Sequence, residues 1–162
     1  MEQKDIYVPG REYEHPFRFS RWSTELWNNP LILRLVKFLR LPIPFDPVIN
    51  FMWLTGDWND IHYDIAAAEQ SPIGCIAVPG ILVESVFSKI LGTQFPGHGT
   101  VYLSKSLEFR RPLLANSDYL AVVRIEKVFN SRHVLELSTE IFSLDRSTKY
   151  VAGTAKIMNK KI

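Results

Sequence analysis

One mainly apolar stretch in the middle of the chain constrains the fold most. Residues 81–91, ILVESVFSKIL, follow Val78-Pro79-Gly80 and carry apolar side chains around most of a helix circumference. A helix of this kind must be buried on nearly every side. We therefore expect the rest of the chain to surround it. The apolar positions are Ile81, Leu82, Val83, Val86, Phe87, Ile90 and Leu91.

The sequence after Thr100 predicts the strands that would surround this helix. VYLSKSLEF alternates between apolar and polar residues. Its predicted apolar face consists of Val101, Leu103, Leu107 and Phe109. Turn-forming residues at 130–131 and 145–147 separate three further predicted strands. These strands span 119–129, 133–142 and 149–158.

The N-terminal region adds an edge strand. Aromatic residues at 13, 17 and 19 alternate with polar ones, and Pro16 is tolerated better at the edge of a sheet than at its centre. One apolar helix followed by antiparallel strands predicts an α+β fold, with an antiparallel sheet wrapped around a long apolar central helix.

Length and composition narrow the class of protein. A chain of 162 residues is the size of one domain, so we expect a single domain over 1–162. A net charge of +2 gives no reason to expect nucleic acid binding. The lone Cys75 has no internal disulfide partner, and the N-terminus lacks an apolar signal segment, so we expect a cytoplasmic protein without a membrane span.

Residues 28–47 predict an inserted amphipathic helix followed by a proline-rich turn. Asn28-Asn29-Pro30 resembles a helix start, and the helix would end near Leu41. Its cations at 34, 37 and 40 share one face. Three interpretations are open: a helix laid over the core, a lid over an acyl pocket or dock for an acidic carrier protein, and a segment that binds a membrane surface.

The polar stretch 57–64, DWNDIHYD, interrupts the apolar pattern. On one continuous α-helix, Asp57 and His62 would point about 140° apart. Gly56-Asp57-Trp58-Asn59 is typical of a turn, from which both side chains can converge. The alternative is that Asp57 caps a helix starting near Trp58 while His62 is a surface residue.

A carboxylate and an imidazole together suit general acid/base chemistry. The histidines at 15, 62, 98 and 133 lack metal-ligand spacing, so we expect no metal, and no serine-nucleophile motif occurs. Proton transfer next to a polarised carbonyl also needs an oxyanion donor. The Gly80 N–H, at the start of the apolar helix, is a candidate because the helix dipole favours negative charge there.

Three linked motifs resemble MaoC-like (R)-specific enoyl-CoA hydratases and 3-hydroxyacyl-thioester dehydratases. The similarity covers residues 51–158. The motifs are Gly56 to Asp64, Val78 to Leu82, and the stretch from Phe95 to Leu103 with Leu107-Glu108-Phe109 and Pro112 after it.

The resemblance implies a hot-dog fold, usually a homodimer whose sheets join. It implies reversible hydration of trans-2-enoyl thioesters to (R)-3-hydroxyacyl thioesters, with coenzyme A or phosphopantetheine as part of the substrate and no separate cofactor. By position, Asp57 and His62 match the catalytic pair, and Asn59 matches a residue that braces the loop. Gly80 matches the backbone donor to the thioester oxygen, and Ser88 matches a polar residue lining the site.

The sequence departs from the family pattern in several places. Asp60 stands where proline is usual, and it either acts on His62 electrostatically or faces solvent. Pro79 stands where histidine is common, and the turn at 115–118 is longer than usual. Ser88 is open to a second interpretation, as a helix serine bonded back to a carbonyl.

Two further functions stay open from sequence. One is a hot-dog acyl thioesterase, and the other is a catalytically silent module that binds acyl chains or carrier proteins. The choice between coenzyme A and a carrier protein is open as well. Lys105, Arg110 and Arg111 are candidate contacts for substrate phosphates.

Overall fold

The computed structural model describes residues 7–20, 31, 35 and 46–162. The chain separates into two compact units. The first, the sheet unit, comprises 1–17, 84–111 and 118–162, and the second, the loop unit, comprises 18–83 and 112–117. Leu31 and Leu35 are helical, but the rest of the predicted helix at 30–41 lies outside the described residues. The insertion at 28–47 and the single domain over 1–162 therefore stay predictions.

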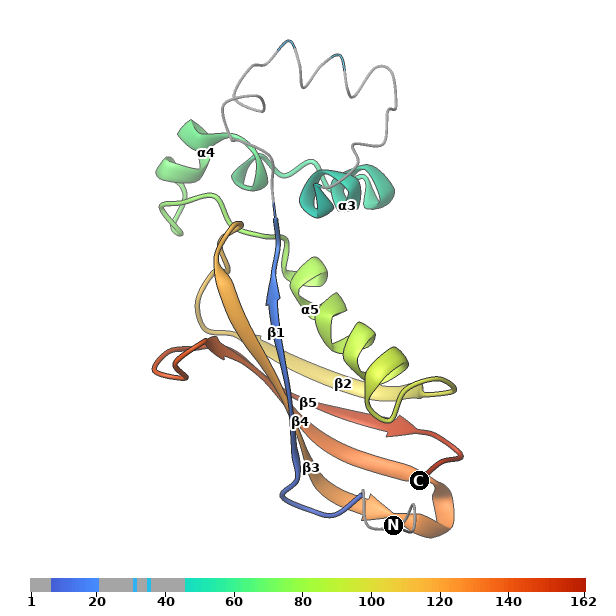
Figure 1. The fold of residues 1–162 in the computed structure, drawn as a ribbon. Helices are drawn as coiled ribbons and strands as arrows, with labels where there is room; N and C mark the ends of the chain where they lie inside the picture. The colour runs from blue at the N-terminus through green and yellow to red at the C-terminus, as the bar shows by residue number, and fades with distance from the viewer. Residues whose placement is uncertain (1–6, 21–30, 32–34, 36–45) are drawn as a thin grey trace. The chain divides into compact units, whose positions relative to one another are not determined.

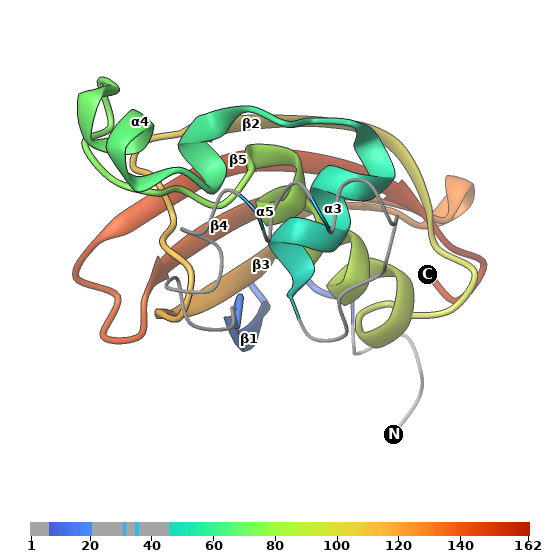
Figure 2. The ribbon, with the colours of Figure 1, turned by 90° about the horizontal axis from the view of Figure 1, so that it is seen from above.

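The sheet unit is built on five strands in the order β1-β3-β4-β5-β2 (Figures 1 and 2). The pairs β3–β4, β4–β5 and β5–β2 are antiparallel. The strands are β1 (Glu12–Arg18), β2 (Val101–Phe109), β3 (Asp118–Phe129), β4 (Val134–Ser143) and β5 (Lys149–Met158). The predicted strands are confirmed, and each of their ends coincides with the prediction or differs from it by one residue. The small differences arise because hydrogen bonding to a neighbouring strand, rather than the apolar pattern, sets the ends.

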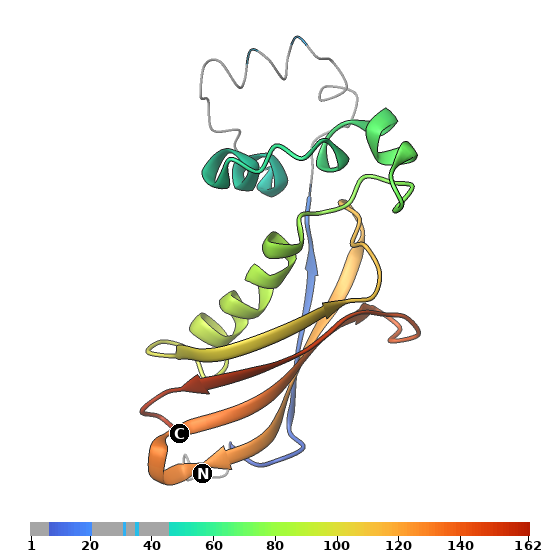
Figure 3. The same ribbon diagram turned by 180° about the vertical axis from the view of Figure 1, so that it is seen from behind.

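Helix α5 (Gly80–Lys89) continues into a π-helical turn at Ile90–Gln94. From Glu84 onward it belongs to the sheet unit, and this part lies along one face of the sheet (Figures 1 and 3). The unit's core combines apolar residues of this helix and turn with those of the sheet: Val86, Phe87, Ile90, Leu91, Ile125, Leu135, Leu137 and Ile157. The predicted α+β arrangement of a sheet around an apolar helix is confirmed.

Two details of that prediction are wrong. Ile81 on the first turn of α5 is 63% exposed, so burial does not extend around the whole helix. On β2, Val101, Leu103 and Phe109 of the predicted apolar face are exposed as well. A register shift between Tyr102 and Ser104 interrupts the alternation, and β2 is an edge strand with a sheet neighbour on only one side.

The loop unit contains α3 (Pro47–Thr55), a short 3₁₀ turn η2 (Asp60–His62) and α4 (Ile65–Gln70). The buried Asp46 carboxylate accepts hydrogen bonds from Val48 N and Ile49 N and so caps α3. Asp64 caps α4 by accepting from Ala67 N. Among the described helices, none is long and apolar enough to cross a membrane.

Candidate active site

The polar stretch begins where α3 ends. Gly56 adopts a left-handed conformation, with φ of 76°, and its N–H donates to Met52 O at 2.9 Å. This φ suits glycine, which terminates the helix and turns the chain into the loop that carries Asp57. The predicted turn at 56–59 is therefore confirmed.

The backbone of Asn59 connects the two predicted catalytic residues. Its N–H donates to Asp57 Oδ1 at 3.3 Å, and its carbonyl accepts from the His62 N–H at 3.1 Å. The first bond forms a turn closed by an aspartate side chain, and the second starts η2. The alternative in which Asp57 caps a helix near Trp58 is wrong, since the residue preceding η2 is Asn59 and Asp57 is exposed.

His62 is only 8% exposed, so its interpretation as a surface residue is wrong. Its Nδ1 lies 2.7 Å from the carbonyl oxygen of Ala77. A carbonyl only accepts hydrogen bonds, so Nδ1 must carry the proton. In the neutral ring this leaves the lone pair on Nε2, which is the nitrogen suited to accept a proton.

Ala77 also joins His62 to the segment that leads into α5. The Ala77 N–H donates to Ile61 O at 3.4 Å, and Val78 N donates to Leu113 O at 2.8 Å. These bonds fix the segment that leads into Gly80. Sequence reasoning missed Ala77 because its contribution comes from the backbone, and a methyl side chain gives no signal.

Gly80 is the first residue of α5, where backbone N–H groups have no acceptor within the helix. The buried Pro79 does not disturb this start, since its carbonyl accepts the first helical bond from Val83 N at 3.0 Å. Proline lacks an N–H, but the helix needs none at this position. The departure from the family pattern at 79 therefore leaves the helix N-terminus intact.

Three aromatic rings adjoin the polar stretch. The Trp53 and Trp58 ring centroids are 5.0 Å apart, and those of Trp58 and Tyr63 are 6.3 Å apart, both edge to face. Burial, followed by the negative charges of Asp60 and Asp64, raises the pKa of Tyr63. The Tyr63 phenol is thus a neutral group at physiological pH. The pattern of apolar and polar residues in the sequence does not predict that these three rings contact one another.

Asp60 is exposed, as in the second of its two interpretations. It is the first residue of η2. Proline suits this position because its fixed φ is that of a helix, and aspartate suits it because a negative charge is favoured near a helix N-terminus. Asn59 before it has φ of −64° and ψ of 122°, a conformation that a following proline permits. The exchange of proline for Asp60 thus preserves the local backbone.

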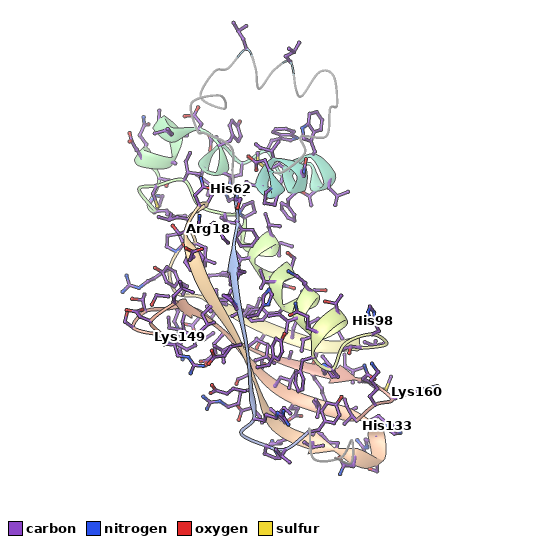
Figure 4. The ribbon with its side chains drawn as sticks, viewed as in Figure 1. Arg18, His62, His98, His133, Lys149 and Lys160 are labelled. Atoms are coloured by element: carbon purple, nitrogen blue, oxygen red, sulfur yellow. The ribbon has the colours of Figure 1, made fainter. Side chains whose placement is uncertain are left out.

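The other predicted residues belong to the sheet unit. Ser88 is exposed on α5, two turns after Gly80. Among the predicted phosphate contacts, Lys105 pairs with Glu84 and Arg110 pairs with Glu108. His98 and His133 lie in loops of the sheet unit, whereas His62 lies in the loop unit (Figure 4). Within the described ranges, no group of three or more His, Cys, Asp or Glu residues could hold a metal ion.

Comparison with known proteins identifies the family. The sequence model of the MaoC-like domain matches residues 33–140, which is more than half of the chain. The chain belongs to the MaoC-like domain family. An (R)-specific enoyl-CoA hydratase of Aeromonas caviae is 34% identical over 96 residues, which is 59% of this chain and 72% of that protein. A mitochondrial 3-hydroxyacyl-[acyl-carrier-protein] dehydratase of Solanum lycopersicum is 30% identical over 133 residues, 81% of this chain and 77% of that protein.

Solved structures agree with this membership. The (R)-hydratase from A. caviae involved in PHA biosynthesis superposes with a TM-score of 0.71 at 26% identity, covering 94% of this chain and 96% of that one. The R-hydratase PhaJ1 from Pseudomonas aeruginosa superposes with a TM-score of 0.70 at 21% identity, covering 94% and 81%. The MaoC-like chain described here has the hot-dog fold, and it is a lyase of the hydratase and dehydratase class.

Proposed function

We propose that this MaoC-like protein catalyses the reversible addition of water to trans-2-enoyl thioesters, giving (R)-3-hydroxyacyl thioesters. The observation that carries the proposal is the orientation of His62 by Ala77, with Nδ1 as the donor and Nε2 as the basic nitrogen. Asp57, in the same turn, supplies a carboxylate, and both residues bond to the backbone of Asn59.

The proposed reaction uses these groups on one water molecule. As the water oxygen attacks C3, a base of the Asp57–His62 pair takes a proton, and the C2=C3 electrons move onto the thioester oxygen. The Gly80 N–H and the helix dipole stabilise the resulting enolate. An acid of the same pair then protonates C2, so that one water has been added. The Asn59 backbone holds the Asp57 carboxylate and the His62 backbone in one turn. Ser88 is proposed to line the site.

The substrate is proposed to be a thioester of coenzyme A or of an acyl carrier protein. The relative from A. caviae is named for an enoyl-CoA, and the relative from S. lycopersicum for an acyl carrier protein. Both carriers present the acyl group on phosphopantetheine, and the reaction needs no further cofactor. A cytoplasmic location stays a prediction from the sequence.

The protein is proposed to form a homodimer through the β2 edge of its sheet. The other edge, β1, contains Pro16, and its Glu12 and Glu14 are paired with Arg146. Proline in an edge strand hinders further strand pairing, because it lacks the N–H that a partner strand would bind. In contrast, β2 is nine residues long, contains no proline and exposes Val101, Leu103 and Phe109. An edge of this kind favours pairing with a second copy.

The test is to incubate the purified protein with a short trans-2-enoyl-CoA while following the absorbance of the conjugated thioester and the release of free thiol. Loss of absorbance without thiol release supports hydration. Thiol release would instead indicate a thioesterase. Binding of the acyl thioester with neither change would indicate a catalytically silent module, and either of these results would overturn the proposal.

A further inference from the structure

An ion pair connects the exposed edge strand to the central helix within the sheet unit. Lys105 Nζ of β2 contacts the carboxylate of Glu84 on α5. The Glu84 side chain is only 18% exposed, whereas the Lys105 side chain is 49% exposed. Because Glu84 lies on α5, the Lys105 side chain must project from the helix side of the sheet.

Lys105 is also the central residue of β2, which runs from Val101 to Phe109. When such a strand pairs with its own copy in antiparallel, full overlap, its central residue lies opposite the same residue of the other copy. Residues directly opposite in an antiparallel pair project from the same face, with Cβ atoms about 4.5–5.5 Å apart. Two Lys105 ammonium groups would therefore meet on the helix side of the joined sheet.

Two like charges placed opposite each other destabilise a strand pair. A lysine in an edge strand is indeed one of the devices by which proteins prevent edges from joining. Taken alone, Lys105 would oppose the pairing that its exposed apolar neighbours Val101, Leu103 and Phe109 favour. A further group must offset this charge if the edge is to join a second copy.

Glu84 is placed to offset it. In each copy the Glu84 carboxylate would pair with the Lys105 of the same copy. The two lysines would then face each other across the interface, each with a carboxylate behind it. On the exposed surface of a single copy, such an ion pair contributes little to the free energy of unfolding. Once the interface excludes water, the attraction strengthens, and a Lys105 without its carboxylate becomes a costly buried charge.

We propose that Glu84 is the counter-ion that allows two β2 edges bearing Lys105 to pair. The partner is a second copy of this chain, and the inference rests on the homodimer of the proposed function. Glu84 thereby acts as a determinant of assembly, separate from the acid/base pair of the loop unit.

The experiment measures the dimer dissociation constant by sedimentation equilibrium for the wild type, Glu84→Gln and the double variant Glu84→Gln/Lys105→Gln. The Glu84→Gln variant is expected to weaken the dimer about tenfold or more, because it leaves two lysines facing each other. The double variant is expected to return within about threefold of the wild type, because both charges are gone.

A matched control is Glu140→Gln. Glu140 pairs with Lys149, and its side chain is 20% exposed, much like that of Glu84, but this pair joins β4 to β5. Its loss is expected to leave the dimer dissociation constant unchanged. If Glu84→Gln does not fold, the charge-exchanged variant Glu84→Lys/Lys105→Glu provides the test, and it should form a dimer while Glu84→Lys alone should not.

The outcomes separate the proposals. A wild type that is a dimer whose dissociation constant does not change in Glu84→Gln would overturn the role of Glu84 and leave the homodimer intact. A monomeric wild type would overturn the homodimer and this inference together. The hydration assay reports independently on the proposed reaction, so a failure of catalysis is not confused with a failure of assembly.

Discussion

His62 and Ala77 are joined by a 2.7 Å hydrogen bond from the imidazole Nδ1 to the backbone carbonyl oxygen. The bond fixes both the ring orientation and the tautomer of a buried histidine. The same alanine bonds through its N–H to Ile61, so the turn carrying His62 and the segment leading to Gly80 are held at two points. These two hydrogen bonds hold the His62 ring in an orientation that suits proton transfer through Nε2.

We predict that His62→Asn and His62→Ala each lower kcat/KM for enoyl-thioester hydration about 100-fold or more, because both remove the basic Nε2. The two variants should differ in stability. The asparagine amide can replace the Nδ1 donor, whereas alanine leaves the Ala77 carbonyl without it, at a cost of about 1–3 kcal/mol. Urea unfolding of both proteins checks this difference. Hydration at the wild-type rate in either variant would remove His62 from the mechanism.

Asp57→Asn is expected to lower kcat/KM by about 100-fold or more while leaving the fold intact, since an amide oxygen still accepts from Asn59 N but no longer exchanges protons. Asp60→Pro serves as the matched control in the same turn. It should keep activity within about threefold of the wild type, because the Asn59 backbone already permits a following proline. Equal losses in both variants would mean that the turn, and not the Asp57 carboxylate, is responsible.

Asp46→Ala is expected to lower the free energy of unfolding by about 1–2 kcal/mol or more, because it removes the cap of α3. The buried carboxylate accepts from both Val48 N and Ile49 N, and alanine would leave these donors without their partner. Asp46→Asn, which retains an accepting oxygen, should lose less. Chemical denaturation measures both, and equal stability of Asp46→Ala and the wild type would contradict the capping role.

Gly153→Ala should destabilise the sheet unit by about 1–3 kcal/mol, since an inserted methyl group must displace the neighbouring strand β2. A Cβ at this position would lie 2.3 Å from Ser106 O and 2.5 Å from Leu107 Cδ2. The control is Gly92→Ala, where nothing lies within 4 Å of the added atom. Thermal unfolding should show a clear loss for the first variant and none for the second.

The stability of the sheet unit should depend on the ionisation of His15. Burial and the nearby Lys89 charge lower the pKa of His15 below its ordinary value of 6.5. A lowered histidine pKa means that folding favours the neutral ring, so its contribution is fully present above pH 6.5 and is lost as the pH falls through the folded pKa.

His15→Gln removes this titration, so its Tm should decline less than that of the wild type between about pH 7.5 and pH 5. Lys89→Met should reduce the decline only in part, because the effect of burial remains. Parallel Tm curves for the wild type and His15→Gln would rule out this role of His15.

The sequence by itself determined the elements of the fold. The apolar run after Val78-Pro79-Gly80 required a buried helix, and the alternation after Thr100 required strands, because burial of apolar area follows the period of each structure. The turn around Asp57 is equally predictable from sequence, since Gly56 and Asn59 are residues that favour turns. Three motifs in fixed order then indicated the family that the comparisons identified.

Only the tertiary structure decided how these elements are used. The tautomer of His62 depends on a carbonyl 15 residues away, and the pairing of Lys105 with Glu84 depends on a strand and a helix meeting. The exposure of the β2 apolar face depends on which strand ends the sheet. Local preferences act between near neighbours in sequence and so determine the elements, whereas these contacts arise only when distant segments pack together.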